Sequence, residues 1–400
     1  MSAMKRLFQL MADKNASDIF LSVGAPINIK INGVAMPVNQ TILNADAVRQ
    51  LLNEVLTERQ SREFDDEMEL NTAYTLEGVG TYRISAFRQK GTPAVVVRYI
   101  PGAVPPLDSL GLPEVLKDVI MQKRGFILMV GATGSGKTTS LAAMLDYRNA
   151  QKSGHILTLE DPVEFVFQNR KSIVNQREVG TDTKAFPVAL RNALRQAPDC
   201  ILIGEIRDKD TMSMALQYAQ SGHLCLATLH ANNSYHALNR IITFYPLENR
   251  PTLLLDLSAS LQGIISQRLV RTKSGTRKAA VEVMLNTRHI SELIEQGEIN
   301  EIKDAMEKSM APGSQTFEQA LFQLFIEGHI SQDEAMANAD SATNMLWLIN
   351  QATAGELTQP ETTQAVPTAT PLDTTAPQDA LARTSPGMDF TNIKIDVTAN

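Results

Sequence analysis

A glycine-rich octapeptide between an apolar run and a helix-forming run constrains the fold of this chain more than any other feature. It fits the pattern G-x-x-x-x-G-K-[ST] and comprises Gly131, Ala132, Thr133, Gly134, Ser135, Gly136, Lys137 and Thr138. Glycine allows backbone angles that turn successive N–H groups toward one point, where they can bind phosphate oxygens. The run 126–130 predicts a buried strand before the loop, and 139–149 predicts a helix after it, whose N-terminus favours anions. The sequence therefore predicts a P-loop.

Two side chains of the octapeptide complete the predicted site. Lys137 would place a positive charge on the β- and γ-phosphates of a nucleotide, and the Thr138 hydroxyl would join the ligand shell of Mg²⁺. The alternative, a glycine turn that binds nothing, is disfavoured because a strand and a helix flank the motif as a P-loop requires. ATP and Mg²⁺ are therefore the predicted ligands.

The runs around the octapeptide predict an α/β fold. From 114 to about 285, short apolar runs alternate with helical segments, the clearest runs being 126–130, 156–159, 200–203 and 224–228. This spacing is typical of βαβ units and of a parallel sheet covered on both faces. We expect the P-loop domain to span 114–285 and a mainly helical segment to span 286–354.

The two ends of the chain differ from this central part. Residues 1–100 predict a small α+β domain with helices at 4–14 and 45–56, the second capped by Asn44, and a hairpin turn at Asn32-Gly33. Proline and glycine in 101–113 predict an interdomain linker. Threonine, proline and alanine dominate 355–400, which predicts a disordered C-terminal tail.

Acidic residues follow two of the predicted strands. Glu205 comes after the apolar run 200–203, and an acid at such a strand end commonly holds Mg²⁺ through water in P-loop enzymes. Glu160 ends the run 156–159, where a carboxylate could orient or deprotonate the attacking water. A solvated loop carboxylate is the alternative for Glu205. A turn or helix cap is the alternative for Glu160, since Asp161-Pro162 is also turn chemistry.

Histidines and arginines supply the remaining candidates. His223 and His230 flank the run 224–229, and a neutral imidazole can contact a phosphate, although a purely structural role is equally open. A transferring phosphoryl group also needs a cation, which a neighbouring subunit can supply as an arginine. Arg83 and Arg98 in the N-terminal domain are candidates, and the alternative for either is a solvated surface position.

Composition excludes several classes of function. The net charge of −7 argues against nucleic-acid binding, and no apolar run reaches the roughly 18 residues that span a bilayer. The first residues predict an amphipathic helix and not a signal peptide, so a cytoplasmic location is expected. Cys200 and Cys225 lie in apolar runs and are predicted to be small core residues.

Four motifs in this order resemble the secretion ATPases, the superfamily of type II secretion and type IV pilus motors. The segments 131–138, 158–164, 190–208 and 222–231 resemble their Walker A, Asp box, Walker B and His box. The segments 174–179 and 253–269 resemble the pilus retraction branch, PilT and PilU. The segment 289–296 departs from the basic motif of PilT, because Ser291 and Glu295 occupy two basic positions, and this departure resembles PilU.

The resemblance implies a RecA-like P-loop domain after a PAS-like N-terminal domain, and a homohexamer with nucleotide between subunits. It implies that Glu160 is the catalytic base, that Glu205 is the Walker B acid and that His230 senses the γ-phosphate. It further implies that Arg83 and Arg98 reach the phosphates.

The resemblance also implies a function in pilus retraction at the inner membrane, with a platform protein and a PilT-like motor as partners. Two alternatives stay open: a nucleotide-binding scaffold that hydrolyses little ATP, and a secretion or pilus assembly ATPase. The second is disfavoured because such motors carry a four-cysteine zinc module, and this chain has two cysteines.

Overall fold

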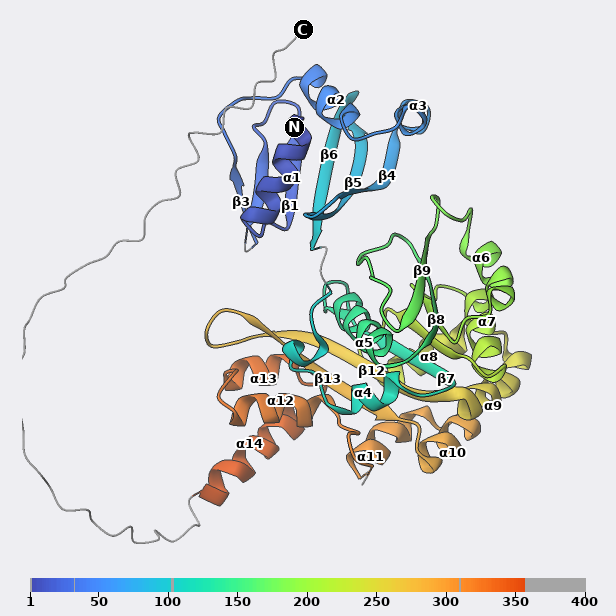
Figure 1. Ribbon diagram of the computed structural model, residues 1–400. Helices are drawn as coiled ribbons and strands as arrows, with labels where there is room; N and C mark the ends of the chain where they lie inside the picture. The colour runs from blue at the N-terminus through green and yellow to red at the C-terminus, as the bar shows by residue number, and fades with distance from the viewer. Residues whose placement is uncertain (1, 32, 102–103, 309–310, 357–400) are drawn as a thin grey trace, which may run out of the picture. The chain divides into compact units, whose positions relative to one another are not determined.

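The computed structural model describes residues 2–31, 33–101, 104–308 and 311–356. The tail predicted to be disordered from residue 355 therefore lies almost wholly outside the described residues. The chain divides into two compact units, one built mainly from residues 2–71 and 83–99 and the other mainly from residues 100–348 (Figure 1).

The N-terminal unit contains a six-stranded sheet in the order β3-β2-β1-β6-β5-β4. The strand β1 pairs antiparallel with both of its neighbours, β2 and β6, and β2 pairs antiparallel with β3. The strands are β1 (Asp18–Ser22), β2 (Asn28–Ile31), β3 (Val34–Pro37), β4 (Glu69–Leu76), β5 (Gly80–Gln89) and β6 (Thr92–Pro101). The helices are α1 (Ala3–Asp13), α2 (Ala45–Asn53) and α3 (Glu58–Glu67).

Most predicted elements of this unit are confirmed. The Asn44 side chain caps α2 by accepting from the Ala47 N–H at 2.8 Å, and Gly33 has a φ of +85° in the turn between β2 and β3. The sequence analysis did not predict α3 and β4. In α3, Phe64 is the one buried residue of a strongly polar segment, so hydrophobic periodicity gave no signal.

The larger unit contains a seven-stranded sheet in the order β13-β12-β7-β11-β10-β8-β9. All neighbouring pairs are parallel except β12 and β13. The predicted α/β fold with a parallel sheet is therefore confirmed. The strands are β7 (Gly125–Val130), β8 (Gly154–Glu160), β9 (Ser172–Glu178), β10 (Cys200–Ile203), β11 (Leu224–Leu229), β12 (Leu261–Arg271) and β13 (Arg277–Leu285).

Helices cover both faces of this sheet, which explains why its central strands are apolar at consecutive positions. Every residue of β7 is buried, with Phe126 in the core on one face and Ile127 in the core on the other. The helices of the unit are α4 (Val115–Ile120), α5 (Lys137–Gln151), α6 (Phe186–Ala193), α7 (Lys209–Gln220), α8 (Ser234–Thr243), α9 (Arg250–Ser260), α10 (Arg288–Gln296), α11 (Ile302–Glu307), α12 (Phe317–Ile326), α13 (Gln332–Asn338) and α14 (Ala342–Glu356).

Three features of this unit differ from or refine the sequence analysis. The strands β12 and β13 were not predicted, although they form one side of the sheet. The segment predicted as a linker is packed in its second half, because Leu107, in the 3-10 helix Leu107–Leu110, is buried in the same core as α5. Cys200 and Cys225 are buried core residues, as predicted.

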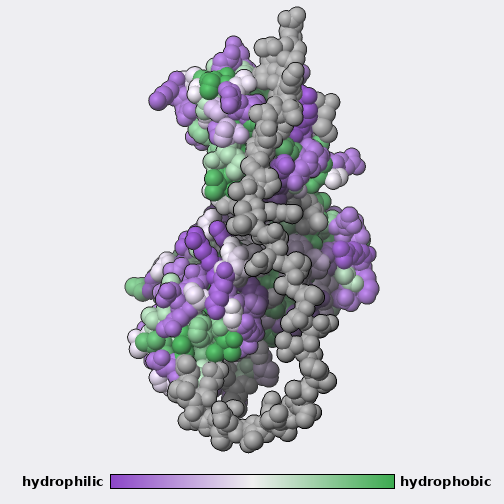
Figure 2. Space-filling model, turned by 90° about the vertical axis from the view of Figure 1, so that its left-hand side faces the viewer, coloured by the Kyte–Doolittle hydropathy of each residue, from purple (hydrophilic) through white to green (hydrophobic). Residues whose placement is uncertain are grey.

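The surface mixes hydrophilic and hydrophobic side chains on the face that Figure 2 shows. Within the described part of the chain, no helix combines the length and the apolar character that crossing a bilayer requires.

Candidate functional site

The carboxyl ends of four adjacent parallel strands bring the predicted site residues to one edge of the sheet. Gly131 follows β7, His230 follows β11, Glu205 lies two residues beyond β10, and Glu160 is the last residue of β8. These strands are neighbours in the order β7-β11-β10-β8. The carboxyl edge of an open parallel sheet is where α/β proteins bind ligands. The fold therefore places the octapeptide, both acids and one histidine around a common edge.

The glycines of the octapeptide have the conformations that the motif requires. Gly134 and Gly136 have φ angles of +77° and +85°, and Gly136 precedes the first residue of α5. A Cβ on Gly131 would lie 2.5 Å from Ser135 Oγ and 2.6 Å from the Gln267 carbonyl oxygen. A larger residue would strain the backbone at Gly134 and Gly136 and would collide with its neighbours at Gly131.

Lys137 is held inside this loop. Its side chain is buried, and Nζ donates to the carbonyl oxygens of Gly131 at 2.8 Å and Ala132 at 2.9 Å. Burial lowers the pKa of Lys137, and the nearby charges of Glu205 and Glu164 partly oppose that shift. A buried cation next to a helix N-terminus is suited to bind an anion.

Other polar atoms of the loop also fit a phosphate ligand. Ser135 is buried, and its Oγ has no hydrogen-bond partner among the described residues. Thr138 is half-buried in the first turn of α5. An unpaired buried hydroxyl is costly, and a bound phosphate oxygen would satisfy it.

Glu160 is a buried carboxylate with two side-chain donors. Its Oε1 accepts from Thr158 Oγ1 at 2.6 Å and from Gln176 Nε2 at 3.2 Å. Desolvation raises the pKa of Glu160, while the hydrogen bonds from Thr158 and Gln176 act in the opposite direction. A carboxylate with a raised pKa is a stronger base than a solvated one, which suits a proton acceptor at neutral pH.

Glu205 joins an arginine and a histidine. Its Oε2 accepts from Arg207 Nε at 2.8 Å, and its Oε1 lies 3.5 Å from His230 Nε2. Arg207 Nη1 also lies 3.7 Å from Asp161 Oδ2, so this arginine connects the segments that follow β10 and β8. Arg207 thus holds one oxygen of Glu205, and the carboxylate could still contact a cation, directly or through water.

His223 and His230 lie at opposite ends of the strand β11. His223 precedes β11, and its Nδ1 lies 3.1 Å from Ser221 Oγ. A strand of this length separates its two ends by about 20 Å. The pair that the sequence singled out is therefore divided, and only His230 lies at the edge with the octapeptide.

Gln267 on β12 is a site residue that the sequence analysis missed. Its Nε2 donates to the Ser135 carbonyl at 2.8 Å, and its Oε1 accepts from Ser140 Oγ at 2.7 Å. It is buried and fixes both the loop and the first turns of α5. More than a hundred residues separate it from the octapeptide, so no local pattern could identify it.

Arg83 and Arg98 belong to the N-terminal unit. Arg83 lies on β5, and Arg98 on β6, where its Nε is 3.0 Å from Asp18 Oδ1. The side chain of Arg98 is 61% exposed. Their predicted contact with phosphates stays a prediction.

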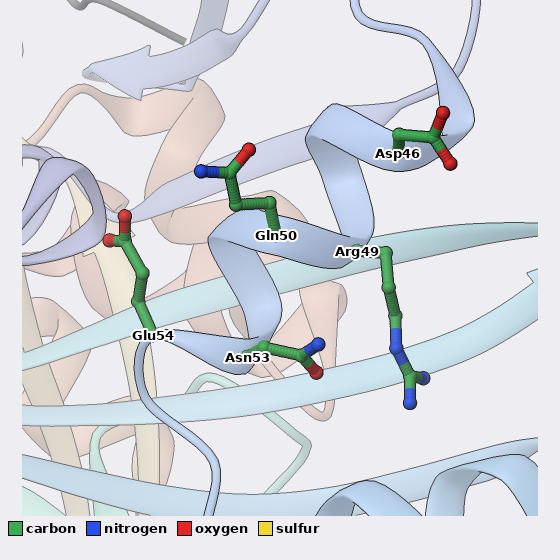
Figure 3. A pocket seen from close by; sticks show the side chains of 5 residues that line it. All are labelled: Asp46, Arg49, Gln50, Asn53 and Glu54. Carbon is green, nitrogen blue, oxygen red and sulfur yellow. The ribbon is translucent and has the colours of Figure 1, made fainter. Parts of the chain in front are cut away.

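A hollow on the N-terminal unit lies along α2 (Figure 3). Its lining residues are Asp46, Arg49, Gln50, Asn53 and Glu54. The Arg49 guanidinium is turned toward α3, where Nη2 lies 2.6 Å from Asp65 Oδ2. This hollow offers acids and a cation that is already paired, so it is a poor phosphate site compared with the octapeptide.

Comparison with known proteins identifies the family. Residues 2–335 match the family described as Type II/IV secretion system protein. The chain is 47% identical over 346 residues to the type IV pilus ATPase PilU of Pseudomonas aeruginosa, covering 86% of this chain and 91% of that protein. The chain belongs to the type II/IV secretion system protein family, as a PilT/PilU-type secretion ATPase.

Further relatives support the same family membership. The PilT protein of Pseudomonas aeruginosa, named a type IV pilus retraction ATPase, is 39% identical over 84% of this chain and 98% of its own length. A crystal structure of the pilus retraction motor PilT with bound ADP has a TM-score of 0.81, 36% identity and coverage of 87% of this chain and 99% of that chain. The ATPase DotB of Legionella pneumophila has a TM-score of 0.72, with 27% identity over 84% of this chain and 95% of that chain. The resemblance to secretion ATPases drawn from the motifs is thus confirmed.

Proposed function

We propose that this secretion ATPase binds ATP at the octapeptide and hydrolyses it to ADP and phosphate. The amides of residues 131–138 and Lys137 bind the phosphates, and Thr138 and Glu205 hold Mg²⁺, the acid partly through water. When bound, Mg²⁺ neutralises charge on the phosphates. Glu160 accepts the proton of the attacking water, and His230 contacts the γ-phosphate.

The shared carboxyl edge of β7, β11, β10 and β8 is the observation that carries this proposal. Hydrolysis requires a phosphate-binding loop, a base and a polar contact to the γ-phosphate within one site. The loop, Glu160 and His230 come from segments up to a hundred residues apart, and the sheet brings them to one edge. A glycine turn without a ligand would not need these groups beside it.

We further propose that hydrolysis drives pilus retraction. The support is the similarity to the proteins named PilU and PilT and to a crystal structure of the pilus retraction motor PilT with bound ADP. In this proposal six copies form a ring, and Arg83 and Arg98 of one subunit reach the nucleotide of the next. Loss of the γ-phosphate changes the relation of the two units within the ring, which acts on a platform protein at the inner membrane from the cytoplasmic side.

The test compares two substitutions with a matched control. Lys137→Ala removes the phosphate contact and should abolish ATP turnover and weaken ADP binding, whereas Lys123→Ala removes an exposed lysine of the same unit and should change neither. The mass of the particle should rise to that of six chains when an ATP analogue is added. Wild-type turnover in Lys137→Ala would remove the phosphate assignment, and a monomer under every condition would remove the ring.

A scaffold function remains the second candidate, and one observation favours it. The segment 289–296, which departs from the basic motif of PilT, lies on α10. Its aliphatic residues Ile290, Leu293 and Ile294 are buried. Glu295 is exposed, and Ser291 Oγ donates to the Ser258 carbonyl at 3.0 Å, so neither supplies a cation. A scaffold for a PilT-like motor would bind ATP with single-turnover phosphate release far slower than that of an active motor. Rapid release by the isolated protein would exclude this candidate.

A further inference from the structure

The loop between His230 and α8 is short and is held by side chains of α8 itself and of the distant strand β12. Arg240 Nη1 donates to the His230 carbonyl at 2.8 Å, and Arg268 Nη2 donates to the Asn232 carbonyl at 3.1 Å. Asn233 caps α8, since its Oδ1 accepts from the His236 N–H at 3.0 Å. The position of the His230 ring beside Glu205 therefore depends on side chains outside the loop itself.

Arg268 on β12 contacts four residues in three separate parts of the chain. Besides the Asn232 carbonyl, its guanidinium donates to the Asn338 carbonyl at the end of α13 and forms an ion pair with Asp340. Its Cζ lies 3.8 Å from the centre of the buried Phe317 ring on α12. A planar guanidinium can stack on a ring and donate in several in-plane directions at once, which an ammonium cannot do.

Asp340 connects the same loop to the segment between α13 and α14. One carboxylate oxygen accepts from Arg268, and the other accepts from Asn233 Nδ2 at 2.7 Å. The side chain of Asp340 is 11% exposed and that of Arg268 is 21% exposed, so water competes little for these bonds. Asp340 thus gives both of its oxygens to groups that position the loop after His230.

Gln267, the residue before Arg268 on β12, holds the octapeptide. Gln267 binds the octapeptide and α5, whereas Arg268 binds the loop after His230. Consecutive side chains of a strand point to opposite faces, so adjacent residues reach the two sides of the same site. The strand β12 therefore fixes the position of the octapeptide relative to the His230 loop.

We propose that Arg268 and Asp340 are positioning residues for hydrolysis, and that through them the C-terminal helices α12 and α13 hold the His230 loop against Glu205. This inference rests on the proposed ATPase function and deepens it. The pair touches no reacting atom and acts through Asn232 and Asn233. Its loss should lower the rate of the chemical step while leaving the octapeptide, and hence nucleotide binding, intact.

Two conservative substitutions test the proposal. Arg268→Lys keeps the charge but cannot make the stacked, forked set of contacts. Asp340→Asn has a single acceptor oxygen for two donors, Arg268 and Asn233. The matched control is Arg148→Lys, which makes the same change in another buried arginine. Arg148 lies on α5, and its Nη1 donates to the carbonyl oxygens of Ile120 at 2.6 Å and Gln122 at 2.9 Å. Both carbonyls precede β7, so these bonds lie at the amino end of the strands, away from the His230 loop.

The readouts are kcat, KM, the ADP dissociation constant, Tm and hydrogen exchange of the peptide 229–236. Each test variant should lower kcat by roughly ten- to a hundredfold with ADP affinity within about twofold of wild type, since loss of positioning affects the reacting geometry and not ground-state binding. Exchange of peptide 229–236 should accelerate in both variants. Arg148→Lys should lower Tm comparably without slowing turnover.

Two results would overturn the proposal. One is unchanged exchange of peptide 229–236 in both test variants. The other is a fall in kcat for Arg148→Lys equal to that of the test variants at equal loss of Tm. If the wild-type protein does not hydrolyse ATP, the proposed function fails by itself, and the exchange measurement still reports whether Arg268 and Asp340 hold the loop.

Discussion

Replacing Thr158 by valine should change the pH dependence of ATP hydrolysis. The Thr158 hydroxyl donates to Glu160 Oε1 at 2.6 Å, and Thr158 is fully buried. Valine has nearly the same shape, so the substitution removes one hydrogen bond to a buried carboxylate with little change in packing. A hydrogen bond to a charged group contributes about 1.5–3 kcal/mol. Because about 1.4 kcal/mol corresponds to a tenfold change in an equilibrium, the ionised form of Glu160 should become at least about tenfold less favoured.

The sign follows from the cause of the existing shift. Burial already raises the pKa of Glu160, and the bond from Thr158 acts to lower it, so its removal raises the pKa further. A general base works in its ionised form. The acid limb of the pH profile of kcat/KM should therefore move to higher pH, with a rate loss of about tenfold on that limb and recovery at alkaline pH.

The assay is phosphate release measured across a series of pH values for the wild type, Thr158→Val and Thr158→Ser. Serine keeps the hydroxyl and should keep the wild-type profile. A Thr158→Val profile that coincides with that of the wild type, or that falls by the same factor at every pH, would refute the assignment of Glu160 as the base.

Three further predictions concern other parts of the larger unit. Gly136→Ala should weaken ADP binding at least tenfold as measured by calorimetry, because φ is +85° at this position and the added Cβ would lie 2.7 Å from Gln267 Nε2. The control Gly78→Ala, whose added Cβ has open space around it, should leave ADP binding unchanged. Equal ADP affinities of the two variants would contradict the loop geometry. Burial raises the pKa of Cys200 to about 12 and also raises the pKa of Cys225. Mass spectrometry should therefore show no alkylation of either thiol in the native protein and alkylation of both after unfolding. Rapid labelling of the native protein would contradict this. Burial raises the pKa of Glu282, so the folded state retains a proton that the unfolded chain releases, and stability is lost as pH rises through the folded pKa. Denaturant unfolding should show Glu282→Gln gaining stability relative to wild type as pH rises above the ordinary carboxyl pKa of about 4.3, and a constant difference would contradict this.

Local sequence patterns were sufficient for the octapeptide and for the strands that end at the site. The runs 126–130, 156–159, 200–203 and 224–228 are apolar because helices cover both faces of the sheet, and each is a strand within one or two residues of its predicted bounds. A strand followed by an acid or by the glycine loop predicts that edge without further information. This is why the positions of Glu160 and Glu205 at the edge could be predicted.

Residues that act across long sequence separations could not be predicted in this way. Gln267, Arg268 and Asp340 bind loops more than thirty residues away, and their own surroundings carry no pattern that names a partner. The strand β12 that carries two of them follows α9 without a turn signal, so its strand character depends on pairing with β7. His223 is a different case, because it adjoins β11 in the sequence but lies at the end of that strand away from the octapeptide.

Single-turnover phosphate release by Glu160→Gln tests the central claim most directly. Glutamine keeps the size of the side chain and an acceptor for Thr158 but cannot take a proton from water. We predict that this variant binds ATP as tightly as wild type and releases phosphate slower by on the order of a hundredfold or more. Phosphate release at the wild-type rate from bound ATP would contradict the account, because Glu160 would then not be the group that takes the proton from the attacking water.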